Sequence, residues 1–257
     1  MLGWVVSSPS LGGFHVASLL TSLMLVLSVG PLGSISGRVV LVGEAPAAAE
    51  IDPGSDACCV KAAPKSEHCV VGPDRGLANV VVTLRPTTSL PSADLPTEAV
   101  EMHNLGCAFV PRVAVVRVGQ SFAMVNSDPT THNMNATLRR NGAFNLVLPP
   151  EDRREIVFEQ AESKPLAISC NVHPFMRGYL YVVDHPHVVV TEESGRIAFD
   201  AVPSGEVACR FWHEGKRLAG ASIDDRKTDR RGEAMLSLEP EEHLDLGEVE
   251  VRLVQAP

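Results

Sequence analysis

Residues 170–176, CNVHPFM, place a thiol, an imidazole and a thioether within one short run: Cys170, His173 and Met176. Sulfur ligands are soft and imidazole is intermediate, so this set suits copper and does not suit magnesium or calcium. Upstream, an apolar strand-like run ends near a second histidine, His132. One cysteine and two histidines in a trigonal arrangement, with a weak axial methionine, are the ligands of a blue-copper site. The sequence therefore predicts a metal site built from two separate loops.

Each of these residues also has an ordinary structural explanation. A cysteine or a methionine can simply fill a hydrophobic core, and a lone histidine is more often a surface residue or one satisfied by local hydrogen bonds. Three such residues can also fall close together by chance. The second histidine is what makes the ligand interpretation the stronger one.

The composition describes a globular protein with many turns. The chain has 257 residues, enough for two ordinary domains or for one domain with an insert. Aromatic residues make up only 5%, so aliphatic side chains must fill the core. The net charge is -9 and no basic cluster occurs, which argues against nucleic-acid binding. No Ser-His-Asp arrangement, phosphate-binding glycine loop or paired-carboxylate motif stands out, so we expect no enzyme activity.

The cysteine content favours an oxidising compartment. Five cysteines remain once Cys170 is assigned to the metal, so at least one has no disulfide partner within the chain. Cys58 and Cys59 are adjacent, and adjacent cysteines rarely bond each other because the geometry is strained. One prediction is a disulfide between Cys107 and Cys58 or Cys59, although no local feature selects this pairing. The pairing of the other cysteines stays open: Cys69 and Cys209.

The first 33 residues have the pattern of an export signal. No charged residue precedes Arg38, and residues 16–29 are largely apolar. This run is shorter than the roughly 20 residues that a transmembrane helix needs, but it has the length of a secretory h-region. The usual basic residue before it is missing. Residues 1–33 are thus predicted to be a signal peptide, or alternatively an uncleaved anchor and the only contact with a membrane. The expected location is periplasmic or extracellular.

Strand signals dominate the rest of the chain. β-Branched runs at residues 34–42 and 80–84 are followed by a turn-rich segment at residues 86–96. From residue 102 to residue 184, short apolar runs alternate with turn signals, and a further set of strand-like runs follows. No amphipathic helix of ordinary length is evident. The pattern predicts an all-β protein built from sandwiches.

Residues 99–184 resemble the cupredoxins, particularly the plastocyanin-like domains. The matching features are FVP at 109–111, VGQ at 118–120, the loop at 126–133 that ends in His-Asn, and Cys170-x-x-His173. The short spacing from His173 to Met176 is more similar to the binuclear copper loop of oxidase subunits. That loop has a second cysteine, which this chain lacks, so the resemblance implies a mononuclear site in a Greek-key sandwich.

The flanking residues resemble a second sandwich, the carboxypeptidase regulatory-like or transthyretin-like module. Its opening motif is matched by GRV at 37–39, and its closing motif by Thr191, Gly195, Pro203 and Gly205. Since these parts lie before and after the copper region, we expect the cupredoxin to be inserted between residues 34–98 and 185–257. Two independent small sandwiches are the alternative.

The cupredoxin resemblance implies one type 1 copper ion held by His132, Cys170, His173 and Met176. It also implies that Asn133 supports the Cys170 sulfur and locks the two loops together. In this family an exposed edge of the second histidine carries electrons, so we expect a redox protein to dock transiently near His173. The implied function is an exported blue-copper electron carrier. The alternatives are a non-redox copper-binding or delivery protein, or an interaction module on a cupredoxin scaffold.

Two further histidine groups are not expected to bind metal. His213 and Glu214 are adjacent in a predicted strand, so their side chains point to opposite faces. His185 and His187 share a face, but we expect them in a solvated turn.

Overall fold

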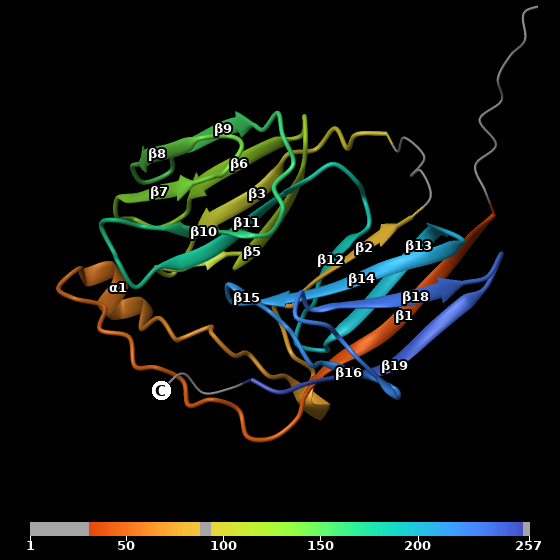
Figure 1. Ribbon diagram of the computed structural model, residues 1–257. Coiled ribbons are helices and arrows are strands. Elements are labelled where there is room, and N and C mark those ends of the chain that lie inside the picture. The colour runs from red at the N-terminus through yellow and green to blue at the C-terminus, as the bar shows by residue number, and fades with distance from the viewer. Residues whose placement is uncertain (1–30, 88–93, 254–257) are drawn as a thin grey trace, which may run out of the picture.

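The computed structural model describes residues 31–87 and 94–253 (Figure 1). Within these ranges the chain is built from strands, with one short helix, α1 (Ala57–Ala62), and one 3-10 turn, η1 (Pro73–Arg75). The all-β expectation is confirmed. Most of the predicted signal peptide or anchor lies in residues 1–30, outside the described residues. In the described part, no helix is long and apolar enough to cross a membrane.

The middle of the chain forms one two-sheet sandwich, here called the central sandwich (β3 to β11). The strands of its first sheet are, in spatial order, β5 (Val113–Arg117), β11 (Arg177–Val183), β10 (Leu166–Ser169), β7 (His132–Thr137) and β8 (Ala143–Leu148). Those of its second sheet are β4 (Phe109–Val110), β3 (Val100–Asn104), β6 (Ser121–Asn126) and β9 (Arg153–Val157). Between them lies a core of buried apolar side chains that includes Phe109, Phe122 and Met134.

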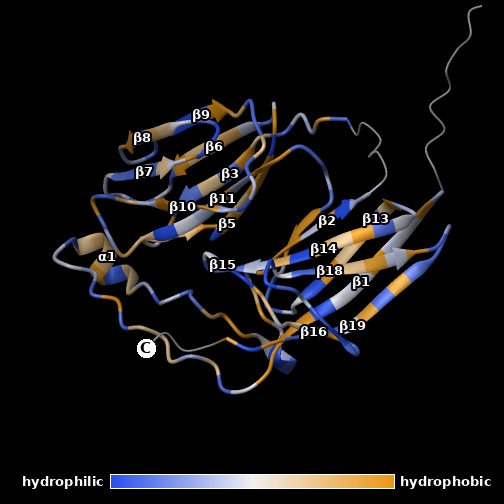
Figure 2. Ribbon diagram, viewed as in Figure 1, coloured by the Kyte–Doolittle hydropathy of each residue, from blue (hydrophilic) through white to orange (hydrophobic). Residues whose placement is uncertain are grey.

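The strands before and after this segment form a second pair of sheets, here called the flanking sandwich. One sheet contains β13 (Arg196–Pro203), β1 (Leu32–Leu41), β19 (His243–Val251), β16 (Ser222–Ile223) and β17 (Arg226–Lys227). The other contains β12 (Val188–Val190), β2 (Val81–Pro86), β14 (Gly205–His213) and β15 (Lys216–Arg217), with β18 (Glu233–Leu238) paired to β14. Apolar and polar residues alternate along β19, as a strand with one buried face requires (Figure 2).

Strands from both ends of the chain share these two sheets. β1 pairs antiparallel with β13 and parallel with β19, and β2 lies between β12 and β14. The Thr191 hydroxyl donates to the Leu77 carbonyl at 2.7 Å and accepts from the Val80 amide at 3.0 Å, which joins β12 to the start of β2. The two flanks thus build one sandwich in space. Their membership of the carboxypeptidase regulatory-like family, and the boundaries at residues 98 and 184, stay predictions.

A buried contact fixes the two sandwiches against each other. Tyr179 of β11 packs edge-on against Trp212 of β14, with ring centroids 4.8 Å apart. Beside them, the guanidinium of Arg112 donates to both carboxylate oxygens of Glu214 at 2.6 and 2.8 Å. Burial, with the nearby Glu214 carboxylate, raises the pKa of Tyr179 to about 12. The start of β11 is therefore held next to β14 of the flanking sandwich.

Helix α1 belongs to the segment between β1 and β2 but packs on the central sandwich (Figure 1). Its N-cap is Asp56, whose Oδ1 accepts from the amides of Cys58 at 2.8 Å and Cys59 at 3.4 Å. A disulfide joins Cys59 to Cys107, in the turn between β3 and β4. The prediction that Cys107 pairs with Cys58 or Cys59 is confirmed, with Cys59 as the partner.

Candidate metal centre

Two neighbouring strands bring the predicted ligands together. His132 is the first residue of β7, and Cys170 directly follows the last residue of β10. β10 pairs antiparallel with β7, so the start of β7 and the end of β10 lie next to each other, at the same end of the sheet. After Cys170 the chain turns and returns as β11, and the turn carries His173. Neighbouring strand ends thus supply the whole set.

The donor atoms of His132, Cys170 and His173 form a compact, buried triangle. The Cys170 sulfur lies 4.0 Å from Nδ1 of His132 and 3.8 Å from Nδ1 of His173, and the two Nδ1 atoms are 3.0 Å apart. All three residues are at most 5% exposed. Together they form one group with the spacing to hold a metal ion.

The dimensions of this triangle fit one ion. A point equidistant from three atoms with these separations lies about 2.1 Å from each, close to the bond lengths of about 2.0 Å to nitrogen and about 2.3 Å to sulfur at protein metal sites. A thiolate and two imidazoles are ligands for copper or zinc rather than for magnesium or calcium. The residues therefore fit a thiophilic transition-metal ion without movement of the backbone.

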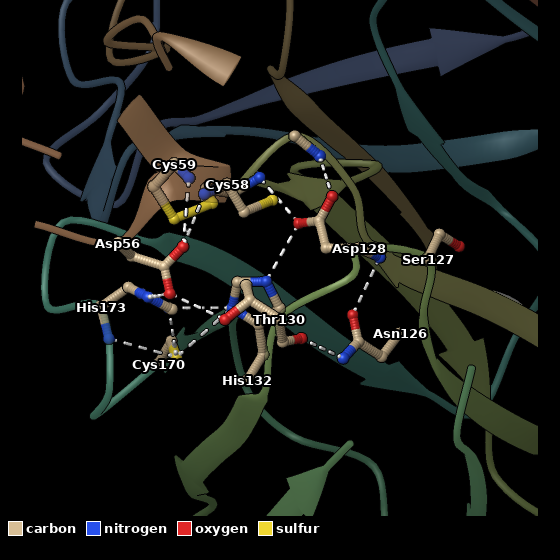
Figure 3. A network of polar contacts seen from close by, with 12 residues as sticks. Asp56, Cys58, Cys59, Asn126, Ser127, Asp128, Thr130, His132, Cys170 and His173 are labelled. Carbon is tan, nitrogen blue, oxygen red and sulfur yellow. Dashed lines mark hydrogen bonds and ion pairs between the residues drawn. A yellow bond between two sulfur atoms is a disulfide. The ribbon is translucent and has the colours of Figure 1, made fainter. Parts of the chain in front are cut away.

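Two carboxylates fix the tautomers of the imidazoles. Nε2 of His132 lies 3.0 Å from Oδ2 of Asp128, and Nε2 of His173 lies 3.5 Å from Oδ2 of Asp56 (Figure 3). A carboxylate accepts a hydrogen bond, so it favours the tautomer protonated at Nε2 and leaves a lone pair on Nδ1. Two unprotonated Nδ1 atoms cannot bond each other, and a cation placed between them satisfies both.

Electrostatics favour neutral imidazole at His132. Burial, with a smaller contribution from the neighbouring His173, lowers the pKa of His132, although its hydrogen bond to Asp128 acts in the opposite direction. A neutral imidazole is the form that binds metal.

Asn133 links the two loops through several bonds. Its backbone amide donates to the Cys170 sulfur at 3.5 Å, and the His173 amide donates to the same sulfur at 3.4 Å. The side-chain oxygen of Asn133 accepts from the amides of Asn171 at 2.7 Å and Val172 at 3.2 Å. The same oxygen lies 3.3 Å from the Cys170 sulfur, where it can accept a hydrogen bond from the thiol. Two backbone amides, those of Asn133 and His173, therefore point at the Cys170 sulfur.

Met176 closes the turn that carries the ligands. Its amide donates to the His173 carbonyl at 2.9 Å, and its carbonyl accepts from the Cys170 amide at 3.2 Å. The side chain is buried. These backbone bonds hold the turn at the site, while axial ligation by the Met176 sulfur stays a prediction.

The position of Asp56 over the His173 ring, here called the cover of the site, was missed by sequence reasoning. We expected an exposed loop there, but the His173 side chain is buried, and Asp56 of the α1 segment lies against its Nε2. The same Asp56 oxygen accepts from the Thr130 hydroxyl at 2.7 Å, which is the main cause of the lowered pKa of Asp56. Nothing in the sequence around Asp56 indicated that its side chain reaches residues 130 and 173.

Two further groups were considered in the sequence, His185 with His187 and His213 with Glu214, and neither has the spacing of the ligand set among the described residues. His185 and His187 are buried, so the expectation of a solvated turn is wrong; burial lowers the pKa of His185 to about 4. The carboxylate of Glu214 bonds to Arg112. Among the described residues, neither His185 with His187 nor His213 with Glu214 belongs to a group spaced to hold a metal ion.

Asp56→Asn tests the role of the α1 segment at this site. Asparagine still caps a helix, but it removes the negative charge beside Nε2 of His173. Groups that orient a metal-bound histidine commonly contribute tenfold or more to affinity, so we expect copper affinity to fall by about tenfold in a chelator competition titration. Asp52→Asn, an exposed carboxylate in the same segment, should leave the affinity unchanged. Equal affinities for Asp56→Asn and the wild type would contradict this role.

Comparisons with known proteins give partial structural likenesses. No family model and no curated protein matches the chain. One similar structure is a Cu-containing nitrite reductase from Thermus scotoductus SA-01. The alignment covers 38% of this chain and 25% of the reductase chain, with 21% sequence identity and a TM-score of 0.32. Amicyanin from Paracoccus versutus matches 39% of this chain and 96% of its own, with 23% identity and a TM-score of 0.30. For a purple cupredoxin from Nitrosopumilus maritimus, the alignment covers 32% of this chain and 98% of the cupredoxin chain, with 24% sequence identity and a TM-score of 0.28.

Proposed function

We propose that the chain binds one copper ion as a type 1 centre and carries single electrons between redox proteins. His132, Cys170 and His173 would hold the ion, and the Met176 thioether would add a fourth, weaker contact. The observation that carries this proposal is the buried triangle of one sulfur and two Nδ1 atoms, whose imidazoles are each held by a carboxylate. Copper fits better than zinc because the set adds only a weak thioether to three ligands, whereas a structural zinc site needs four strong ones.

The chain contributes rigidity around the ion. A copper ion held by these residues would supply one-electron chemistry, because copper has a cuprous and a cupric state. Both imidazoles are oriented by carboxylates, and the Cys170 sulfur accepts from two backbone amides. Such a network resists rearrangement when the charge at the site changes, which suits electron transfer.

We also propose that the protein works outside the cytoplasm and docks a redox partner near His173. The Cys59–Cys107 disulfide supports an oxidising compartment. Next to His173, the apolar side chain of Val172 is 55% exposed, and the Phe175 ring lies 5.8 Å from the His173 ring. A small apolar contact of this kind suits a transient partner.

A second candidate function is copper delivery without redox work. The cover that Asp56 places over His173 favours it, because an electron carrier gains from an exposed imidazole edge.

Loading with one equivalent of cupric ion separates the two functions. An electron carrier should show an intense visible thiolate-to-copper band, reversible reduction and retention of the ion in both states. A delivery protein should remain colourless, bind cuprous ion tightly and pass it to an acceptor. Absence of stoichiometric binding would overturn both and favour an interaction module.

Met176→Leu tests the axial ligand. Leucine has similar volume but no sulfur, so the protein should keep copper within about tenfold of the wild-type affinity while its reduction potential shifts, because the axial ligand tunes the potential of such a site. Redox titration of the visible band measures the shift. Met102→Leu, in the core of the same sandwich, is the matched control and should leave the potential unchanged. An unaltered potential in Met176→Leu would remove Met176 from the ligand set.

A further inference from the structure

The disulfide that joins α1 to the central sandwich is connected to both ligand histidines through two carboxylates. The Cys107 amide donates to Oδ2 of Asp128 at 2.9 Å, and the same oxygen contacts Nε2 of His132. On the other side, the Cys59 amide donates to Asp56, whose second oxygen contacts Nε2 of His173 (Figure 3). Each half of the disulfide is therefore one carboxylate away from an imidazole of the metal centre.

A free thiol lies beside this disulfide. Cys58 is unpaired and partly exposed, and its sulfur, the Cys107 sulfur and a carboxylate oxygen of Asp128 all lie within 4.8 Å of one another. Cys58 and Cys59 are consecutive residues of α1, and both sulfurs lie near Cys107: that of Cys59 in the disulfide and that of Cys58 within 4.8 Å.

The Cys59 sulfur faces a different set of groups. It lies within 4.8 Å of a ring nitrogen of His173 and of a carboxylate oxygen of Asp56, which are themselves within that distance of each other. If the bond to Cys107 moved from Cys59 to Cys58, the released sulfur would stand next to His173.

We propose that Cys58 is an exchange thiol that moves the disulfide between Cys59–Cys107 and Cys58–Cys107. The Cys58 thiolate attacks the Cys107 sulfur, the new sulfur–sulfur bond forms, and Cys59 leaves with the electron pair of the broken bond. Cys59 then takes up a proton, which replaces the one that Cys58 released. The step conserves electrons and needs no external oxidant or reductant.

This exchange would present either of two thiols at the surface of the metal centre. With Cys59–Cys107 closed, the free thiol is at Cys58, beside Asp128. With Cys58–Cys107 closed, a soft sulfur is placed beside His173 and Asp56, in the cover of the centre. The inference depends on the thiol and the disulfide, and it stands whether or not the centre binds copper.

The charges around Cys58 set the pH dependence of the exchange. Burial raises the pKa of the Cys58 thiol, and so do the carboxylates of Asp128 and Asp56, whereas Lys61 acts in the opposite direction. The attacking species is the thiolate, so below this pKa the exchange rate should rise about tenfold for each pH unit. Exchange is thus slow at neutral pH and faster in alkaline solution.

Trapping with N-ethylmaleimide tests the proposal on the full-length, metal-free protein. The background is Cys69→Ser, which removes a further partly exposed thiol. The folded protein is incubated with the reagent at several pH values and digested without reduction, and fragment spectra locate the label. We expect label on Cys59 together with a Cys58–Cys107 disulfide, formed faster at higher pH. Label confined to Cys58 at every pH and time would overturn the proposal.

Two variants make the result specific. Cys58→Ser should abolish the labelling of Cys59, because no thiol remains to release it. Cys59→Ser should form the Cys58–Cys107 disulfide on air oxidation. If Cys59→Ser folds but leaves both thiols free, the proposal fails; if it does not fold, the comparison between the Cys69→Ser protein and its Cys58→Ser derivative decides alone. Equal labelling of Cys59 in those two proteins would indicate release by another route and would contradict the exchange.

Discussion

Cys170→Ala is expected to abolish the visible thiolate-to-copper band of the copper-loaded protein. The Cys170 sulfur is the single soft anionic donor of the triangle, since Met176 is uncharged and both imidazoles are neutral ligands. Without it, two nitrogens remain, and we expect copper affinity to fall by at least about a hundredfold, more than for loss of a supporting group. Absorption spectroscopy and chelator competition measure the two effects.

Cys209→Ala and Cys69→Ala are the matched controls for this loss. Both cysteines are free and belong to the flanking sandwich or pack against it. Each variant should keep the full band, although Cys209→Ala should lower stability because that side chain is buried. A blue band that survives in Cys170→Ala would show that another sulfur holds the ion and that the ligand assignment is wrong.

Asp128→Ala is expected to damage stability and metal binding together. Asp128 is buried, and its carboxylate accepts from the amides of Gly106 at 2.7 Å and Cys107 at 2.9 Å, and from Nε2 of His132 at 3.0 Å. Alanine leaves these buried donors without a partner, which should lower the free energy of unfolding by about 3 kcal/mol. Since His132 also loses the group that orients it, copper affinity should fall by about 10–100-fold.

Denaturant unfolding of the metal-free protein and chelator competition measure these two losses separately. Asp152→Ala is the control, because within residues 31–87 and 94–253 its carboxylate bonds only to the exposed guanidinium of Arg154, so its loss should cost less than about 0.5 kcal/mol. Asp128→Asn keeps one acceptor oxygen and should fall between the wild type and alanine. If Asp128→Ala unfolded like the control, the hydrogen bonds of this carboxylate would not stabilise the turn.

The ligand set could be predicted because its chemistry is local in the sequence. Cys170, His173 and Met176 lie within one turn, and the strand-like run before His132 indicated a second loop. The structure brings His132, Cys170 and His173 together in one buried group. The β-branched runs at residues 34–42 and 80–84 likewise match β1 and β2 within a few residues, because β-branched side chains favour strands.

The cover of the site could not be predicted, because it depends on a contact between distant segments. Asp56 lies in a polar, turn-rich stretch between β1 and β2, where nothing local indicates a contact with Thr130 or His173. Asp128 was inside a motif that we had noted, but its role as an acceptor appears only when the turn after β6 closes around it. Surroundings of this kind arise from tertiary packing rather than from residue pattern.

X-ray absorption at the copper edge of the fully loaded protein tests the central claim most directly. We expect one copper ion per chain with two nitrogen neighbours at about 2.0 Å and one sulfur neighbour at about 2.3 Å or slightly less. A copper environment of nitrogen and oxygen alone, with no short sulfur distance, would contradict the assignment of the ion to His132, Cys170 and His173.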